Sequence, residues 1–164
     1  METYRVPDGA GIGHVHLKVS DIDRALAFYT GVLGFDRILR LGDHAAFVSA
    51  GGYHHHIGLN TWQSRRGTPP PPHHTGLYHF AIRYPTRRDL AIAVRRIIEA
   101  GVRVQGVADH GVSESIYLAD PDGNGIELTR DRPETEWPRD AEGNIALAMA
   151  DPLDLDDLLR EAVS

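Results

Sequence analysis

GHVHLKVSDIDRALAFYTGVLGF, residues 13–35, is the stretch that decides the fold. It begins with alternating polar and apolar residues, which predicts a strand, and Ser20–Asp21 then cap an apolar-periodic helix. The same pattern recurs at residues 76–102, GLYHFAIRYPTRRDLAIAVRRIIEAGV. It has a strand, a helix that begins at Pro85–Thr86 and a helix end at Gly101. The sequence therefore predicts two copies of one structural unit.

Short strand patterns follow each predicted helix, so that each unit reads β-α-β-β-β. They cover Arg37–Leu41, Ala45–Ser49 and His54–Asn60 in the first unit, and Val102–Val107, Ser115–Ala119 and Gly125–Thr129 in the second. We expect an α+β fold in which the two tandem βαβββ units form one curved mixed sheet, shaped as a cup around a metal ion.

The chain has 164 residues, about the size of one domain. We divide it into unit one at about 11–62, a proline-rich connector at 63–75, unit two at about 76–131 and a C-terminal extension at 132–164. In the extension, three leucines on one stripe predict a short helix over 154–162, which we assign to packing or to a dimer contact.

Composition excludes several classes of site. The chain has no cysteine, which rules out disulfides, thiolate zinc sites and iron–sulfur clusters, and which fits a cytoplasmic protein. A net charge of −6 argues against a nucleic acid as the main partner. No apolar run is long enough for a membrane span, and the first residues lack the pattern of a signal peptide.

Ten histidines are many for a chain of this length, and histidine is the commonest metal ligand. His14 and His79 hold matching places in the two leading strands, and Glu127 lies in the last strand of unit two. Two imidazoles and one carboxylate suit a divalent metal ion with open coordination positions. His16 faces the same side of its strand as His14, and spacing alone does not choose between them.

Further polar residues are candidates for proton transfer. His54, His55 and His56 lie in a strand pattern, whose alternation sends His55 to one face and its neighbours to the other. Tyr117 lies ten residues before Glu127, on the preceding strand of a predicted hairpin, and His110 opens a loop that could overhang the site.

These motifs together resemble the vicinal oxygen chelate superfamily, and within it the extradiol ring-cleaving dioxygenases of the catechol 2,3-dioxygenase type. His14 stands seven residues before Asp21, HFAI follows at 79–82, and GNGIE at 123–127 places Glu127 after a Gly-Asn turn. The resemblance implies that His14, His79 and Glu127 bind Fe(II), with Mn(II) as the alternative, and it favours His14 over His16.

The resemblance also assigns roles to the other candidates. It implies that His55 is the acid–base group, that His56 takes this place in a different register, and that His110 and Tyr117 hydrogen-bond the substrate. The implied substrates are a catechol and O2. Typical extradiol enzymes carry four such units where this chain has two, so we expect a homodimer that supplies the missing contacts or exchanges units between subunits.

Other functions remain open on the same fold. A glyoxalase-like isomerase or a fosfomycin-type thiol transferase is the nearest alternative enzyme, although the first would want an acidic or Gln ligand where this chain has His54–His56. A non-catalytic binding protein of the bleomycin-resistance kind usually lacks the His, His and Glu set. A histidine-rich domain that merely scavenges metal is the least specific reading.

Overall fold

The computed structural model describes residues 3–149 and 151–163. The first unit contains β1 (Val15–Lys18), α1 (Ile22–Leu26), the π-helix η1 (Ala27–Val32), β2 (Asp36–Leu41), β3 (Ala45–Ser49) and β4 (Ile57–Asn60). The second contains β5 (Phe80–Arg83), α2 (Arg87–Glu99), β6 (Gly106–Asp109), β7 (Ser113–Ala119) and β8 (Gly125–Asp131). The C-terminal extension contains the 3-10 turns η2 (Glu134–Glu136) and η3 (Glu161–Val163) around α3 (Leu155–Arg160).

Each unit forms its own four-stranded mixed sheet, with the orders β1-β4-β3-β2 and β5-β8-β7-β6. The first strand of each unit pairs in parallel with the last strand, and the other pairs are antiparallel. The predicted α+β fold of two βαβββ units is confirmed. The strands form two sheets, and no closed barrel is present among the described residues.

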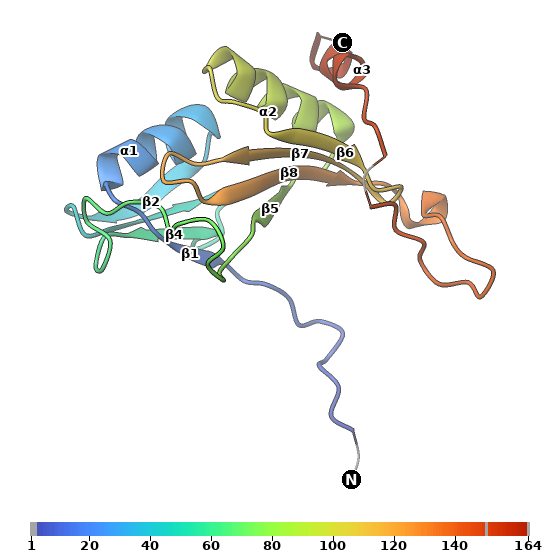
Figure 1. Cartoon of the computed structure of the whole chain (residues 1–164), viewed down its shortest axis with the longest axis horizontal. Helices are drawn as coiled ribbons and strands as arrows, with labels where there is room; N and C mark the ends of the chain where they lie inside the picture. The colour runs from blue at the N-terminus through green and yellow to red at the C-terminus, as the bar shows by residue number, and fades with distance from the viewer. Residues whose placement is uncertain (1–2, 150, 164) are drawn as a thin grey trace.

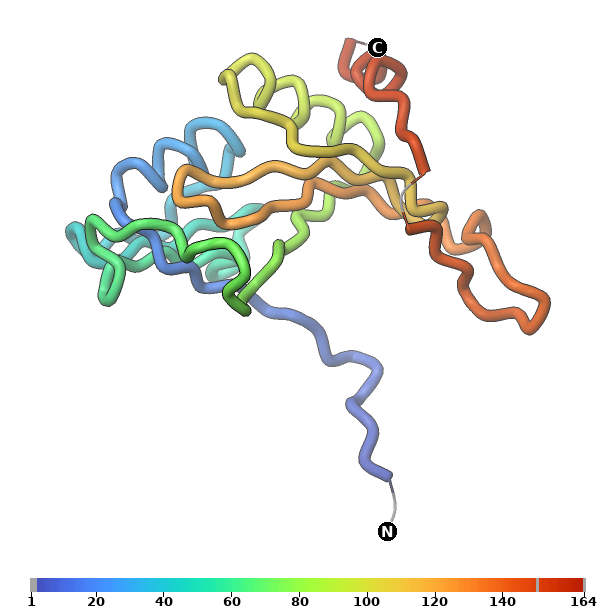
Figure 2. Tube along the Cα trace, viewed as in Figure 1, coloured from blue at the N-terminus to red at the C-terminus, as the bar shows by residue number. Residues whose placement is uncertain are grey.

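Helices cover one side of the two sheets, where α1 and α2 lie side by side (Figure 1). The trace in Figure 2 shows the N-terminal segment leading away from the other side of the molecule. α2 packs its apolar stripe, with Leu90, Val94 and Ile97 fully buried, onto unit two. Each fully buried aliphatic side chain of this kind stabilises the fold by about 1.5–3 kcal/mol.

The helix starts predicted from sequence are confirmed. The carboxylate of Asp21 accepts a hydrogen bond from the backbone N–H of Arg24, and the hydroxyl of Thr86 accepts one from that of Asp89. These caps satisfy N–H groups that the helix itself leaves free. Gly101 after α2 has a φ of 73°, a conformation that favours glycine and ends the helix.

Two predicted strands begin several residues later in the structure. The strand predicted at His54–Asn60 begins only at Ile57, because a turn with positive φ at Gly51 and Gly52 precedes it and the chain joins the sheet after the histidines. The strand predicted at Val102–Val107 is Gly106–Asp109, because its first apolar residues pack against the core before the chain enters the ladder.

Polar contacts join the two units through their helix side. The hydroxyl of Tyr29 in η1 donates to Asp120 in the β7–β8 turn at 2.9 Å, and both side chains are buried. Arg24 in α1 forms an ion pair with Asp122 in the same turn at 2.6 Å. Arg96 of α2 donates to backbone carbonyls at the end of η1. These side-chain contacts therefore fix how the two units lie beside each other.

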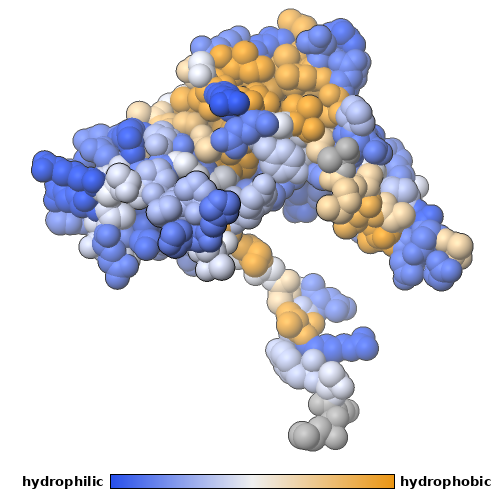
Figure 3. Space-filling view, in the orientation of Figure 1, coloured by the Kyte–Doolittle hydropathy of each residue, from blue (hydrophilic) through white to orange (hydrophobic). Residues whose placement is uncertain are grey.

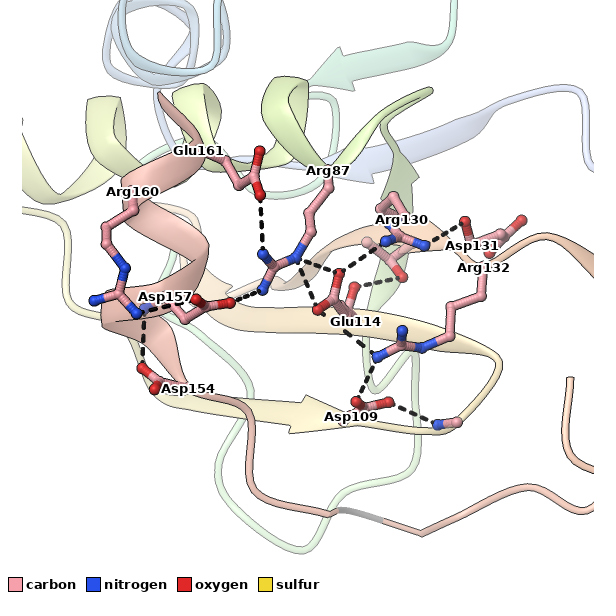
Figure 4. A network of polar contacts seen from close by, with 12 residues as sticks. Arg87, Asp109, Glu114, Arg130, Asp131, Arg132, Asp154, Asp157, Arg160 and Glu161 are labelled. Carbon is pink, nitrogen blue, oxygen red and sulfur yellow. Dashed lines mark hydrogen bonds and ion pairs between the residues drawn. The ribbon is translucent and has the colours of Figure 1, made fainter. Parts of the chain in front are cut away.

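The predicted C-terminal helix is present as α3 and packs beside α2, with Leu158 fully buried in the core. Arg87 at the start of α2 holds it by donating to Asp157 at 2.8 Å and to Glu161 at 3.3 Å (Figure 4). The same guanidinium donates to Glu114, whose side chain is 4% exposed. The tail thus contributes packing, as expected. Among the described helices, none is long and apolar enough to cross a membrane.

Candidate functional site

The imidazole of His79 and the carboxylate of Glu127 lie together on the face of sheet two that the helices leave open. Glu127 is paired with Ala81 across the parallel β5–β8 ladder, and His79 precedes Ala81 by two residues. Alternation along an extended chain therefore puts both side chains on one face. His79 Nε2 lies 3.0 Å from Glu127 Oε2, and the two side chains are 31% and 13% exposed.

Gly125 explains how these side chains come so close. A Cβ built at this position would overlap the carbonyl oxygen of Tyr78 and would lie 3.1 Å from the Cβ of His79. Only glycine therefore lets the segment that carries His79 run directly against the start of β8. The glycine of the GNGIE motif serves this close approach as well as the turn before it.

A hydroxyl chain behind Glu127 holds its second oxygen. Ser115 Oγ donates to Glu127 Oε1 at 2.5 Å and lies 3.0 Å from the hydroxyl of Thr129, which donates in turn to the backbone carbonyl of Glu114. With one oxygen held by a serine, the carboxylate presents its other oxygen beside His79. This is the arrangement in which hydrogen bonds from neighbouring residues orient a metal-binding carboxylate.

Tyr117 stands on the same face, directly opposite Glu127 in the β7–β8 ladder. Its ring centroid lies 5.5 Å from that of His79. Burial, followed by the negative charge of Glu127, raises the pKa of the Tyr117 phenol, so the group is protonated at neutral pH. Its hydroxyl lies 2.8 Å from Nε2 of His110, which brings all four predicted residues of unit two into one cluster.

The predicted residues of unit one form a second cluster. The rings of His14 and His55 have centroids 4.5 Å apart, and His55 also lies edge-on to Phe47 at 5.1 Å. Nδ1 of His54 and Nδ1 of His55 are 2.7 Å apart. The expected alternation of these two histidines between opposite faces is therefore wrong, because both precede β4 and neither is in the ladder. Partial burial, followed by the charge of His14, lowers the pKa of His55.

His16 lies on the open face of sheet one between Phe47 and Trp62, at centroid distances of 5.8 and 5.4 Å. Its ring covers Gly58, where a Cβ would come within 2.9 Å of it. Burial and then the charge of His14 lower its pKa. These contacts give His16 a packing role on this face, next to the candidate ligand His14.

His56 has a structural set of partners. Its Nδ1 accepts hydrogen bonds from the hydroxyl of Ser49 at 2.9 Å and from the backbone N–H of Ala50 at 3.3 Å. Both donors help to hold the turn before β4. His56 and His14 also line a cavity of about 600 Å³ at the junction of β1 and β5, whose other walls are mostly apolar.

The structure thus brings the candidate residues together in two groups. His79, Glu127, Tyr117 and His110 share the open face of sheet two, and His14 lies with His55 on unit one. Within residues 3–149 and 151–163, no three His, Asp or Glu side chains converge closely enough to hold one metal ion. His14 therefore does not complete a ligand set with His79 and Glu127 inside one chain.

Sequence reasoning missed two residues that support the cluster in unit two. Ser115 lies two residues before Tyr117 on β7, so strand alternation could have placed it on the face of Tyr117 and Glu127. Ala148 contacts His110 from the C-terminal extension, at 2.9 Å between its carbonyl oxygen and Nδ1. No local pattern signals that contact, because it joins segments 38 residues apart.

Comparison with known families gives one match over most of the chain. The model described as the Glyoxalase/Bleomycin resistance protein/Dioxygenase superfamily matches residues 11–128. This range covers the first βαβββ unit and the second as far as the middle of β8.

Relatives and solved structures agree with that match. The chain is 43% identical over 151 residues to a catechol-2,3-dioxygenase of Bacillus subtilis (strain 168), covering 92% of this chain and 52% of the relative. It is 28% identical to biphenyl-2,3-diol 1,2-dioxygenase 3 of Rhodococcus globerulus, covering 73% of this chain and 63% of the relative. The chain therefore spans about half to two-thirds of these relatives.

A crystal structure of a glyoxalase/dioxygenase from Nostoc punctiforme superposes with a TM-score of 0.63 at 20% identity, covering 81% of this chain and 99% of that one. At this level of identity the superposition supports the fold alone.

Proposed function

Because the chain belongs to the glyoxalase/bleomycin resistance protein/dioxygenase superfamily, we propose that it is a non-haem Fe(II)-dependent extradiol dioxygenase that cleaves catechol-type rings with O2. One observation carries the proposal: an imidazole and a carboxylate meet at 3.0 Å beside a tyrosine–histidine pair, on an open sheet face. The relative from Bacillus subtilis that bears the name of this activity supports it.

The residues of unit two fit a divalent metal ion. His79 offers Nε2, and Glu127 offers an oxygen whose companion is already engaged by Ser115. An imidazole directly before β5 and a carboxylate on the neighbouring strand β8, with no cysteine in the chain, suit Fe(II) or Mn(II). His14 is the proposed third ligand. When bound, such an ion would hold both catechol oxygens and O2 close together and pass electrons between them.

The remaining side chains of the candidate site would transfer protons and bind the substrate. Tyr117 and His110 form a hydrogen-bonded pair next to the proposed ligands, where they would contact a hydroxyl of the bound catechol. His55 lies against the ring of His14, so it would reach the substrate from the side of unit one as the acid–base group. Replacing His55 by Phe is expected to slow turnover and leave metal binding intact.

We propose further that the site is completed in a homodimer, with His14 from one copy and the His79–Glu127 pair from the other. Each chain has an open face on both sheets, with one proposed ligand on unit one and two on unit two. Large apolar side chains remain exposed, among them Ile12 (91%), Trp62 (64%) and Tyr78 (90%). Figure 3 shows orange apolar residues along the N-terminal segment, which a second copy would cover.

The direct test loads the protein with Fe(II) under anaerobic conditions, then adds a panel of catechols and O2. Oxygen uptake with a yellow ring-cleavage product is the expected result. His79→Ala should abolish iron binding and product together, and His16→Ala is the matched control that should retain both. Turnover of a thiol adduct of methylglyoxal, or of fosfomycin with a thiol, in place of catechol cleavage would overturn the proposal. So would iron binding by His79→Ala at the wild-type level.

A further inference from the structure

The C-terminal extension crosses the loop that carries His110 and is tied to it through the backbone. Asp109 and Asp151 exchange two backbone hydrogen bonds, at 2.9 and 3.0 Å, in an antiparallel bridge. The N–H of Ala148 donates to the carbonyl of His110 at 3.1 Å. Arg132, where the extension begins, forms an ion pair with Asp109 at 2.6 Å (Figure 4). The conformation of this loop thus depends on the extension.

One of these contacts sets the chemistry of the His110 ring. The carbonyl oxygen of Ala148 lies 2.9 Å from His110 Nδ1. Because a carbonyl can only accept, Nδ1 must carry the proton, and the neutral imidazole then has a free lone pair on Nε2. Nε2 lies 2.8 Å from the hydroxyl of Tyr117. The tyrosine therefore donates its proton to the histidine.

We propose that the Ala148 carbonyl is a positioning group, which selects the tautomer of His110 and so turns the Tyr117 hydroxyl proton away from the open face. The phenol oxygen of Tyr117 is then left as a hydrogen-bond acceptor beside His79. It would accept from a hydroxyl of the substrate, which in the proposed function is a catechol hydroxyl. Only the identity of that substrate rests on the proposed function; the tautomer rests on the contacts alone.

This arrangement gives a proton path out of the site. The substrate hydroxyl passes its proton to the Tyr117 oxygen while Tyr117 passes its own proton to His110 Nε2. The substrate becomes an oxyanion, Tyr117 is unchanged, and His110 becomes an imidazolium whose Nδ1–H remains hydrogen-bonded to Ala148. No bond other than O–H and N–H changes, and no oxidant is needed. The carbonyl dipole of Ala148 stabilises the positive charge that forms.

The extension is anchored firmly enough for this role. Leu158 is fully buried, and Arg87 joins α3 to the buried carboxylate of Glu114. Pro138 packs over Gly111, where a Cβ would come within 2.9 Å of the proline ring. The stretch that carries Ala148 is therefore fastened at both ends, and its carbonyl keeps a defined position.

The test reads the tautomer directly and needs neither metal nor turnover. In the metal-free wild-type protein at neutral pH, nitrogen NMR of ¹⁵N-histidine-labelled protein should show His110 with a protonated Nδ1 and an unprotonated Nε2. His110→Gln identifies the signal. A protonated Nε2 in the wild-type protein would overturn the inference, even if the protein cleaves catechol. A protonated Nδ1 with no ring cleavage would refute the proposed function alone.

Variants of the C-terminal extension give a second test of the inference. Ala148→Pro removes the N–H that donates to His110 and displaces the carbonyl, so the NMR signals should shift toward a tautomer mixture. In the iron-loaded enzyme, kcat should fall about tenfold or more with a smaller change in KM. Ala146→Pro is the matched control, since its N–H donates to Pro138 and not to His110. Equal effects of the two variants, or none from Ala148→Pro, would contradict the inference.

Discussion

Mixing a His14→Ala variant with a His79→Ala variant is expected to restore ring cleavage that neither variant has alone. Each single variant removes one proposed ligand from every site and should be inactive. In a mixed dimer with shared sites, one site loses both ligands. The other site keeps His14 from one chain and the His79–Glu127 pair from the second.

The size of the recovery follows from how the structure divides the ligands. His79 and Glu127 belong to the same unit and touch each other, so they always enter a site together. Random reassortment of equal amounts makes about half of the dimers mixed, and each mixed dimer has one intact site of two. The expected recovery is therefore about a quarter of the wild-type activity.

The assay follows oxygen uptake and product colour after the variants have been unfolded, mixed and refolded together with Fe(II). A mixture of His79→Ala with Glu127→Gln is the matched control, because both changes lie in unit two and every site then keeps a defect. Recovery in this control, or none in the first mixture, would refute the shared site. A protein that stays monomeric at assay concentration but is active would refute it as well.

Three further predictions concern stability and are measured by urea unfolding or hydrogen exchange. Tyr29→Phe should lower the free energy of unfolding by about 1–3 kcal/mol, because the buried Asp120 carboxylate loses a donor; an unchanged midpoint would contradict this. Leu158→Ala should lower the free energy of unfolding by about 2–5 kcal/mol, because it leaves a cavity under α3. A smaller decrease would show that the C-terminal extension packs loosely. Hydrogen bonds from Arg87 and then Arg160 lower the pKa of the Asp157 carboxyl below its ordinary value. The stability that these hydrogen bonds give α3 is complete above the ordinary carboxyl pKa and is lost as the pH falls through the lowered pKa. Exchange protection of α3 should therefore weaken in acid. Protection that is independent of pH would refute this prediction.

Local sequence patterns predicted much of the fold. The caps at Asp21 and Thr86 and the stop at Gly101 were predictable, because each acts through neighbours within a few residues. The repeat predicted two equivalent βαβββ units for the same reason, and the structure shows that each unit forms its own sheet. The starts of the strands predicted at His54–Asn60 and Val102–Val107 were less predictable. The histidines at 54–56 and the apolar residues Val102 and Val104 precede the ladders, and a local pattern does not show which residue makes the first pair.

The candidate site was likewise only partly predictable from the sequence. The repeat and the predicted hairpin grouped His79, Glu127 and Tyr117 in one candidate site. The structure has these side chains on one face of sheet two, because the ladder register sets Glu127 opposite both Ala81 and Tyr117. Only the tertiary structure decided which groups meet across the chain. The contact of His79 with Glu127 and the contact of Ala148 with His110 depend on how the sheets and the extension pack. So does the absence of a group of three metal ligands among the described residues. Such contacts join residues far apart in sequence, and no local propensity encodes them.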